Sequence, residues 1–196
     1  MNVALFESDY TDFVVTVIDG SGLDSDNIGE AAITGTEIEA TWVATDALTV
    51  FLSVTKLFDN GWDETGGVDV SGITPGDDVP LVSDFQWTLG ASYEWSLGDL
   101  GDITLNATAK YDDTYFAQAA HQNRPLEQVQ ERTIYNAGLT FNSADEKHRI
   151  WLNGRNISDE QDYYSLLNFS TFLFNNTAIY FPTEPVSWEL GYKYTF

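Results

Sequence analysis

The chain has 196 residues, with 31 Asp and Glu against eight Lys and Arg, so its formal net charge is −23. This balance excludes nucleic-acid binding, because contacts to phosphate need Lys and Arg. The chain contains no Cys, which excludes disulfide frameworks, thiolate metal sites and cysteine nucleophiles. No apolar run approaches the roughly 18 residues of a transmembrane helix.

Segments in which apolar and polar residues alternate recur along the chain. They predict β-strands, because successive side chains of a strand point to opposite faces. The predicted strands, in chain order, lie at about 2–7, 13–19, 37–42, 48–54, 85–95, 103–111, 135–142, 148–156 and 186–196. The pattern therefore predicts an all-β fold of about nine strands and no helix.

The last eleven residues carry the strongest alternation. Their apolar face consists of Trp188, Leu190, Tyr192, Tyr194 and Phe196, and polar residues occupy the positions between. About ten residues let a tilted strand cross a bilayer, and a transmembrane β-barrel strand has one apolar and one polar face. The alternative is the edge strand of a soluble sandwich, which leaves this apolar face without a later element to cover it.

The predicted connections alternate in length. Short turns fall near residues 8–11, 45–47, 96–101 and 143–147, and long loops fall near 20–30, 59–83, 112–131 and 157–185. In an outer-membrane barrel, short turns are periplasmic and long loops are extracellular. This places the C-terminus on the periplasmic side and residue 2 on the outer side. Because bacterial single-chain barrels have an even strand count, nine strands predict a piece of a larger barrel.

Aromatic residues gather near both ends of the predicted strands. Those beside short turns or the terminus are Trp42, Tyr93, Trp95, Phe141, Tyr194 and Phe196. Those beside long loops are Phe58, Phe85, Tyr111, Tyr135 and Trp188. Two such bands are typical of the aromatic girdles at the two membrane interfaces.

Few residues suggest catalysis or metal binding. Glu37 and Glu39 share one strand face, where a hydrated wall of charges is a simpler interpretation than a catalytic carboxylate pair. His121 and His148 lack the neighbours that a catalytic triad or a zinc site needs. The acidic segment 19–27 lacks the Gly and Glu positions of an EF-hand loop. The sequence therefore predicts no enzyme, no resident metal and no cofactor.

The long loops carry two further features. Acidic residues gather at 19–30 and 59–78, where their charge is most simply a hydrated exterior. This charge favours a neutral or cationic ligand over an anionic one, and a saline habitat explains it equally well. The loop at 161–185 is rich in aromatic residues, which fit either a ligand contact or packing over the barrel mouth. The candidate ligand-contact residues are Tyr163, Tyr164, Phe169, Phe172 and Phe174.

Four groups of segments carry a family resemblance: ITGTEIEATWVATDALTVFLSVTKLFDN; PLVSDFQWTLGASYEW; TIYNAGLTF with HRIWLNGRNISDEQDYY; and the terminal WELGYKYTF. In this order they resemble the C-terminal barrel region of the TonB-dependent receptors of Gram-negative outer membranes. The family's Asn-Leu-Thr-Asp type motif reads Asn156, Ile157, Ser158 and Asp159 here. The final Phe196 is similar to the family's last residue.

The resemblance implies an antiparallel up-and-down transmembrane barrel of about 22 strands around a plugged lumen. It further implies uptake of a scarce nutrient, such as a ferric siderophore, cobalamin or an oligosaccharide, with energy passed through TonB. Residues 1–196 are expected to be the C-terminal part of such a barrel, without plug, TonB box or signal peptide. TonB would then act only through the missing N-terminal part. Outer-membrane lipid and the barrel-assembly machinery are the other expected partners, and the apolar face that ends at Phe196 is the expected assembly signal.

Two other functions stay open on the sequence. A complete small outer-membrane barrel or pore needs an even strand count and both chain ends on the periplasmic side. A secreted carbohydrate-binding β-sandwich needs two packed sheets around a dry core.

Overall fold

The computed structural model describes residues 1–19, 22–27, 30–64, 73–118, 127–168 and 178–196. Its main element is an antiparallel sheet with the strand order β1–β4–β5–β7–β8–β11–β12–β15, and β6 pairs with β4 off this path. The strand bounds are β1 Asn2–Tyr10, β4 Glu30–Val43, β5 Leu48–Asp59, β6 Trp62–Glu64, β7 Phe85–Ser96, β8 Gly101–Asp112, β11 Arg132–Ser143, β12 His148–Arg155 and β15 Ser187–Tyr194. We call the path from β1 to β15 the wall.

Three two-stranded sheets accompany the wall. They are β2 (Val14–Asp19) with β3 (Gly22–Asn27), β9 (Tyr115–Phe116) with β10 (Gln128–Val129), and β13 (Tyr163–Asn168) with β14 (Ala178–Pro182). The helical content of the described residues is one 3-10 turn, η1 (Gly98–Leu100). No helix in the described part of the chain is long and apolar enough to cross a membrane.

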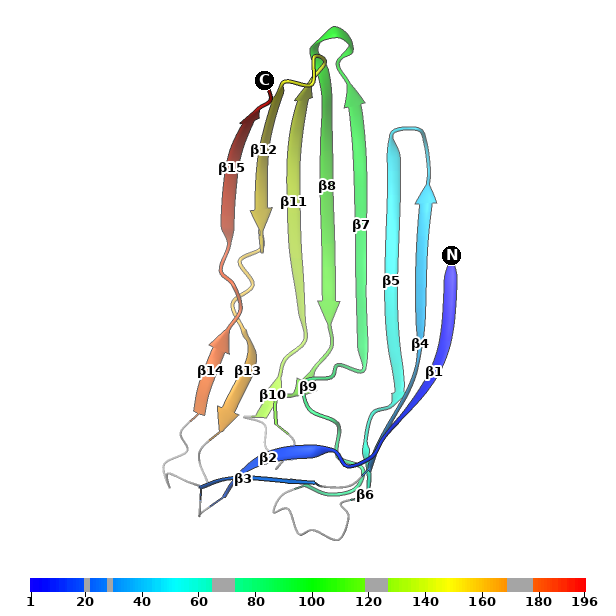
Figure 1. Cartoon of the computed structure of the whole chain (residues 1–196), viewed down its shortest axis with the longest axis vertical. Helices are drawn as coiled ribbons and strands as arrows, with labels where there is room; N and C mark the ends of the chain where they lie inside the picture. Colours follow the sequence, from blue (N-terminus) through cyan, green and yellow to red (C-terminus); the bar gives the residue numbers. More distant parts are fainter. Residues whose placement is uncertain (20–21, 28–29, 65–72, 119–126, 169–177) are drawn as a thin grey trace.

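The connections of the wall separate by length onto two ends (Figure 1). At the turn end, four residues join each pair of strands, at 44–47, 97–100 and 144–147. At the loop end, the long connections 11–29, 60–84, 113–131 and 156–186 carry the small sheets. Both chain ends lie toward the turn end (Figure 1).

One predicted strand lies outside the wall. The segment 13–19 forms β2, but β2 pairs only with β3, and β1 pairs directly with β4. The expected short turn at 8–11 is therefore wrong, because the first connection is a long one at the loop end. The expectation that the two chain ends lie on opposite sides is wrong for the same reason. Short and long connections still alternate along the whole wall path.

The strand register lines up the apolar side chains on one face of the wall. One row crosses six strands as Leu48, Tyr93, Leu105, Leu139, Leu152 and Leu190, each opposite the next. These side chains do not enter a dry core, since Leu105 is 37% and Leu190 76% exposed. Trp188 and Tyr192 share this face and are also exposed. A soluble sandwich would bury this face, so the exposure contradicts that alternative.

Aromatic rings cover glycines of neighbouring strands on both faces. A Cβ atom added at Gly90 would collide with the ring of Phe51, and one added at Gly191 would collide with the ring of Trp151. Trp188 lies across Gly154 in the same way, with ring atoms 2.6 Å from the position of an added Cβ. Such pairs stabilise a twisted sheet, because the ring fills the space that the missing side chain leaves.

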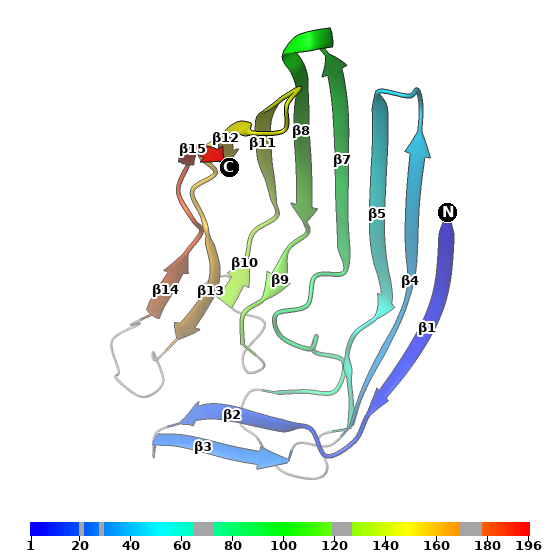
Figure 2. The same cartoon turned by 45° about the horizontal axis from the view of Figure 1, so that its top comes forward.

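The buried apolar residues of the described chain lie at the loop end. Ala31, Leu57, Trp62, Ile73 and Val79 are buried around the connection between β5 and β7. A second cluster joins the β9–β10 and β13–β14 hairpins, which neighbour each other beyond the loop end of the wall (Figure 2). It consists of Ala117, Val129 and Leu166, with Tyr115 and Tyr163 packed against them. Among the described residues, buried apolar side chains therefore stabilise the loop end and not the wall.

Candidate functional site

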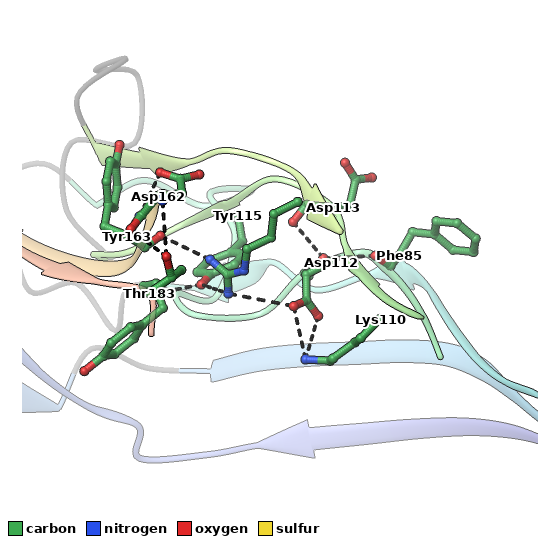
Figure 3. A network of polar contacts seen from close by, with 11 residues as sticks. Phe85, Lys110, Asp112, Asp113, Tyr115, Asp162, Tyr163 and Thr183 are labelled. Atoms are coloured by element: carbon green, nitrogen blue, oxygen red, sulfur yellow. Dashed lines mark hydrogen bonds and ion pairs between the residues drawn. The ribbon is translucent and has the colours of Figure 1, made fainter. Parts of the chain in front are cut away.

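A network of ion pairs and hydrogen bonds gathers where β8 and β11 meet the loop end (Figure 3). Its centre is the buried carboxylate of Asp112, the last residue of β8. Lys110 Nζ lies 2.9 Å from Asp112 Oδ1 and 3.1 Å from Oδ2. Arg132, which the register places directly opposite Asp112, brings Nη2 to 3.7 Å. The buried carboxylate is thus compensated by two cations, which burial of a charge requires.

Arg132 extends this network to both loop-end hairpins. Its Nη1 donates to the backbone oxygen of Tyr163 at 3.1 Å, and its Nη2 donates to the hydroxyl of Tyr115 at 3.3 Å. The guanidinium also lies over the Tyr115 ring, 5.8 Å from the centroid. The Tyr115 hydroxyl in turn donates to the backbone oxygen of Tyr164 at 2.7 Å. One side chain therefore fixes β9 and β13 against the end of the wall.

The start of β13 has its own set of bonds (Figure 3). Thr183 Oγ1 donates to the backbone oxygens of Asp162 at 3.0 Å and Glu160 at 3.1 Å, and accepts from the backbone N–H of Asp162 at 3.2 Å. The hydroxyl of Tyr163 donates to the backbone oxygen of Gln128 at 3.0 Å. Burial raises the pKa of the Tyr163 phenol, and the charge of Asp162 adds to the shift. The Tyr163 bond thus ties the β13–β14 hairpin to the β9–β10 hairpin, and the Thr183 bonds close the base of the β13–β14 hairpin.

The motif residue Asn156 directly follows β12 and organises the connection that it begins. Its side chain is buried, and its Nδ2 donates to the backbone oxygens of Glu160 at 3.0 Å and Glu184 at 2.9 Å. Its Oδ1 accepts from the backbone N–H of Glu160 at 2.9 Å. Asp159 Oδ1 accepts from the backbone N–H of Val186 at 3.3 Å. The motif thus joins the end of β12 to the residues just before β15.

Two adjoining hollows form a groove on the polar face of the wall. The outer hollow, of about 380 Å³, is lined by Lys110, Asp112, Arg132, Ile134, Asn136, Arg155, Asn156, Tyr164, Thr183 and Glu184. The inner hollow, of about 310 Å³, lies further toward the turn end and is lined by residues 106–108, 136–138 and 153–155. Asn136 and Arg155 line both, so the hollows are continuous.

The sequence predicts no catalytic role for Glu37, Glu39, His121 and His148. Among the described residues, none of these side chains forms a catalytic arrangement. Glu37 and Glu39 lie on β4 without a neighbouring acid–base partner or ion pair in the described chain. His148 lies on the apolar face, where its Nδ1 is 2.9 Å from the Tyr192 hydroxyl. His121 lies outside the described residues, as does part of the segment 19–27. No group of three or more metal-binding side chains gathers in the part of the chain that the structure describes.

The acidic loop between β5 and β7 holds its carboxylates by local bonds. Asn60 Nδ2 donates to Asp84 Oδ1 at 2.7 Å, and Asn60 Oδ1 accepts from the Val79 backbone N–H at 3.0 Å. Burial raises the pKa of Asp78, and the neighbouring charges of Asp84, Asp77 and Asp59 raise it further. The carboxylates therefore repel one another in the folded loop.

The predicted ligand-contact residues divide between two roles. Tyr163 packs into the loop-end cluster, so it supports the hairpins instead of facing the groove. Tyr164 is 51% exposed and lines the outer hollow, which fits a ligand contact. Phe169, Phe172 and Phe174 lie outside the described residues.

The predicted assembly signal forms the last strand and the chain end. Trp188, Leu190, Tyr192 and Tyr194 lie on the apolar face of β15, and Phe196 follows the strand, fully exposed. Tyr194 and Phe196 contact edge to face, with ring centroids 4.9 Å apart. The recognition of these residues by the assembly machinery stays a prediction.

Sequence reasoning missed the Asp112 centre and the inner hollow. Lys110 and Asp112 share a strand face, because they are two residues apart, and this was the available signal for the ion pair. Arg132 faces Asp112 because of the register between β8 and β11. A long loop joins these two strands, so the sequence does not reveal that register. Likewise, the floor of the inner hollow is Gly138, whose neighbours across the sheet are Asn106 and Asn153.

An exposed apolar face, a polar grooved face and alternating short and long connections together define the wall of a membrane β-barrel. Residues 1–157 match the family model described as TonB dependent receptor-like, beta-barrel. The chain belongs to this family of TonB-dependent receptor barrels, which are non-enzymatic transporters of Gram-negative outer membranes. No curated protein matches the chain by sequence.

Solved receptor structures share the fold. The chain is similar to the ferric yersiniabactin uptake receptor FyuA from Yersinia pestis, with a TM-score of 0.76 and 13% identity over 99% of this chain and 27% of that one. It is also similar to the ferric-catecholate import receptor Fiu from E. coli K12, with a TM-score of 0.69 and 22% identity over 99% of this chain and 25% of Fiu. The siderophore receptor PiuA from Acinetobacter baumannii matches at a TM-score of 0.70 and 20% identity, over 98% of this chain and 25% of PiuA. The chain thus spans about a quarter of the length of these receptors.

Proposed function

We propose that the chain is the C-terminal part of the barrel of an outer-membrane receptor that takes up a scarce nutrient with energy from TonB. The apolar row from Leu48 to Leu190 then contacts lipid, and the polar face lines the interior. The observation that carries the proposal is the exposure of this row on a wall that matches receptor barrels. TonB would act through residues outside this chain.

The cargo that we propose is a ferric siderophore. Three of the similar structures are receptors whose names specify ferric yersiniabactin, ferric catecholates and siderophores. Another similar structure is named as a copper transporter, so the fold alone does not fix the cargo. The groove at the loop end, with Tyr164 at its outer margin, gives such a cargo a polar wall with one aromatic contact. Cobalamin and an oligosaccharide are the alternative cargoes.

In the proposed orientation, the turn end is periplasmic and the loop end extracellular. Short periplasmic turns and longer extracellular loops are the rule in such barrels. The C-terminus and the start of β1 would then both lie on the periplasmic side. The apolar side chains that end at Phe196 would be presented there to the barrel-assembly machinery.

A complete small barrel or pore gains one supporting observation. The wall path has an even number of strands, and its two ends lie on the same side. Against it stands the open sheet, because β1 and β15 do not pair with each other in the described chain. An open edge in lipid would leave unpaired backbone groups at high cost. The receptor part is therefore the better supported function.

Cysteine labelling on intact cells tests the proposed placement, because the chain has no Cys of its own. Leu81→Cys places a thiol on an exposed long-loop residue, and Asp99→Cys places one in a short turn. We expect a membrane-impermeant maleimide to label the first variant on intact cells and the second only after the outer membrane is opened. Equal labelling of both variants on intact cells would contradict the orientation. Uptake of ferric siderophores that persists without TonB would contradict the transport function.

A further inference from the structure

Two cations face each other at the turn end of the polar face. Arg149, the second residue of β12, lies directly opposite Lys193, the last residue but one of β15. Both are three residues from the apolar row, at Leu152 and Leu190, so they lie on the opposite, polar face. Like charges directly opposite each other on neighbouring strands are destabilising. A chain with 31 acidic residues thus places two of its eight basic residues where they repel each other.

The carboxylate of β15 on this face bonds to another residue. Glu189 lies four residues before Lys193, about 13 Å along the strand. Its Oε1 accepts from Trp151 Nε1 at 2.6 Å, and the Trp151 ring covers Gly191, which lies between Glu189 and Lys193. The guanidinium of Arg149 lies 5.9 Å from the centroid of the same ring. Trp151 therefore binds Glu189 and leaves the two cations without its charge.

Other acidic residues of this corner do not compensate the cations either. Asp145, in the adjacent turn, accepts hydrogen bonds from residues of its own hairpin. Asp102 belongs to the same cross-strand row as Arg149, but Asn142 lies between them, which places Asp102 two strands, about 10 Å, away. Arg149 and Lys193 are exposed and form no ion pair within the part of the chain that the structure describes.

We infer that Arg149 and Lys193 dock an acidic segment of the part of the receptor that fills the lumen. Barrels of about 22 strands enclose a plugged lumen, so the polar face meets protein there. A carboxylate placed between the two cations replaces one repulsion with two attractions. A lipid headgroup is a poorer partner, because lipid contacts the opposite face of the wall. This inference rests on the proposed function, because it takes the polar face to line the interior of such a barrel.

Zero-length crosslinking tests the docking in the whole receptor, purified from outer membranes so that no part of the barrel has to fold alone. A carbodiimide joins an amine to a carboxylate in contact with it, with loss of water. Mass spectrometry of the digested receptor then identifies the joined peptides. We expect Lys193 to be joined to an Asp or Glu that precedes residue 1 of this chain. Crosslinks from Lys193 only to carboxylates within residues 1–196, or no crosslink at all, would overturn the inference.

Lys56 is the matched control lysine. It shares its face of β5 with Leu48, so it belongs to the apolar face and points away from the lumen. We expect no crosslink between Lys56 and the segment that reacts with Lys193. Equal crosslinking of both lysines to that segment would show an unspecific reaction and would overturn the inference.

Two substitutions of Arg149 test whether charge holds the segment. Arg149→Glu places a competing carboxylate opposite Lys193 and repels an acidic segment. We expect the crosslink between Lys193 and the segment to fall about fivefold or more. Arg149→Lys keeps the positive charge, so the crosslink to the segment, summed over both amines, should be retained. An unchanged crosslink in Arg149→Glu receptor, shown to be folded by its heat-modifiable migration, would sink the inference.

The outcome separates from that of the proposed function. Crosslinking is measured on purified receptor without TonB or a siderophore, whereas the transport function is tested by uptake in cells. The Lys193 crosslink without TonB-dependent uptake would refute the function and retain the docking contact. Uptake without the crosslink would refute the docking contact alone.

Discussion

Replacing Asn156 with Ala should open the connection between β12 and β15. The substitution removes three short hydrogen bonds of a buried side chain, to Glu160 N–H, Glu160 O and Glu184 O, and a longer one of 3.5 Å from the Ser158 hydroxyl. At a net contribution of about 1 kcal/mol each, the three short bonds contribute about 3 kcal/mol. Asn156 also has φ 46°, a left-handed conformation that costs Ala about 1 kcal/mol more than Asn. We therefore expect a local loss of about 4 kcal/mol.

Hydrogen exchange measures this loss where it acts. The amides of Glu160 and Val186 report on the connection, because both donate to side chains of the motif. About 4 kcal/mol corresponds to a roughly thousandfold loss of protection. Amides in the middle of the wall, such as that of Leu105, should keep their exchange rates.

Two variants separate the free-energy contribution of the side-chain hydrogen bonds from that of the left-handed backbone conformation. Asn156→Gly loses the same bonds but accepts a positive φ, so it should be about 1 kcal/mol less destabilising than Asn156→Ala. Asn142→Ala is the matched control, because the Asn142 side chain forms no hydrogen bond within the described residues, and it should change stability by about 0.5 kcal/mol or less. If Val186 exchanged at the wild-type rate in Asn156→Ala, the motif would not hold the connection, and this reasoning would be refuted.

Three further predictions concern other parts of the chain. Arg132→Ala should cost about 2–4 kcal/mol and increase proteolysis of both loop-end hairpins, and unchanged cleavage would contradict the bridging role of the guanidinium. Gly191→Val should displace the ring of Trp151, shift its fluorescence and cost about 1–3 kcal/mol in guanidinium unfolding, whereas unchanged fluorescence would refute the contact. The hydroxyl of Ser143 and the Lys147 backbone N–H lower the pKa of Asp145 below 3.8, so its stabilising effect is present above that value and disappears as pH falls through the lowered pKa. In an NMR titration, Ser143→Ala should move the Asp145 midpoint up toward 3.8, and an unmoved midpoint would exclude the hydroxyl as the main cause.

The strands of the wall could be predicted because their physics is local. In β7, β8, β11 and β15 the alternation of side chains identifies the strand, and its apolar side chains lie together on one face of the sheet. Four-residue turns then fix which strands pair and in which register. This information lies within about thirty residues of sequence at a time.

The segment 13–19 shows where the pattern misleads. Val14, Val15, Val17 and Ile18 give it high strand propensity, and β2 does form. However, apolar residues occupy consecutive positions, so the segment has no polar face to line an interior. The strand propensity correctly predicts a strand there. Its pairing partner, however, is β3, which lies in the same long connection. The lack of alternation is therefore the feature of the sequence that distinguishes this segment from the strands of the wall.

The loop end could not be derived, because its order comes from contacts distant in sequence. Leu166 is buried against Ala117 and Val129 of the segment 115–129, and Arg132 meets Asp112 across the 113–131 connection. A long loop sets neither register nor partner. The groove has the same origin, since its floor at Gly138 exists only when three strands are aligned.

The acidic loops do not exclude an anionic ligand from the groove. The sequence favours a neutral or cationic ligand because the loops repel anions, but that repulsion acts over the Debye length, about 8 Å at physiological ionic strength. Inside the groove a ligand meets nearby charges, where Arg155 has no ion-pair partner within the described residues. Lys110, Arg132 and Arg155, three of the chain's eight basic residues, line this one groove. The net charge of the chain therefore affects the association rate of an anion. The charged residues that line the groove affect its affinity.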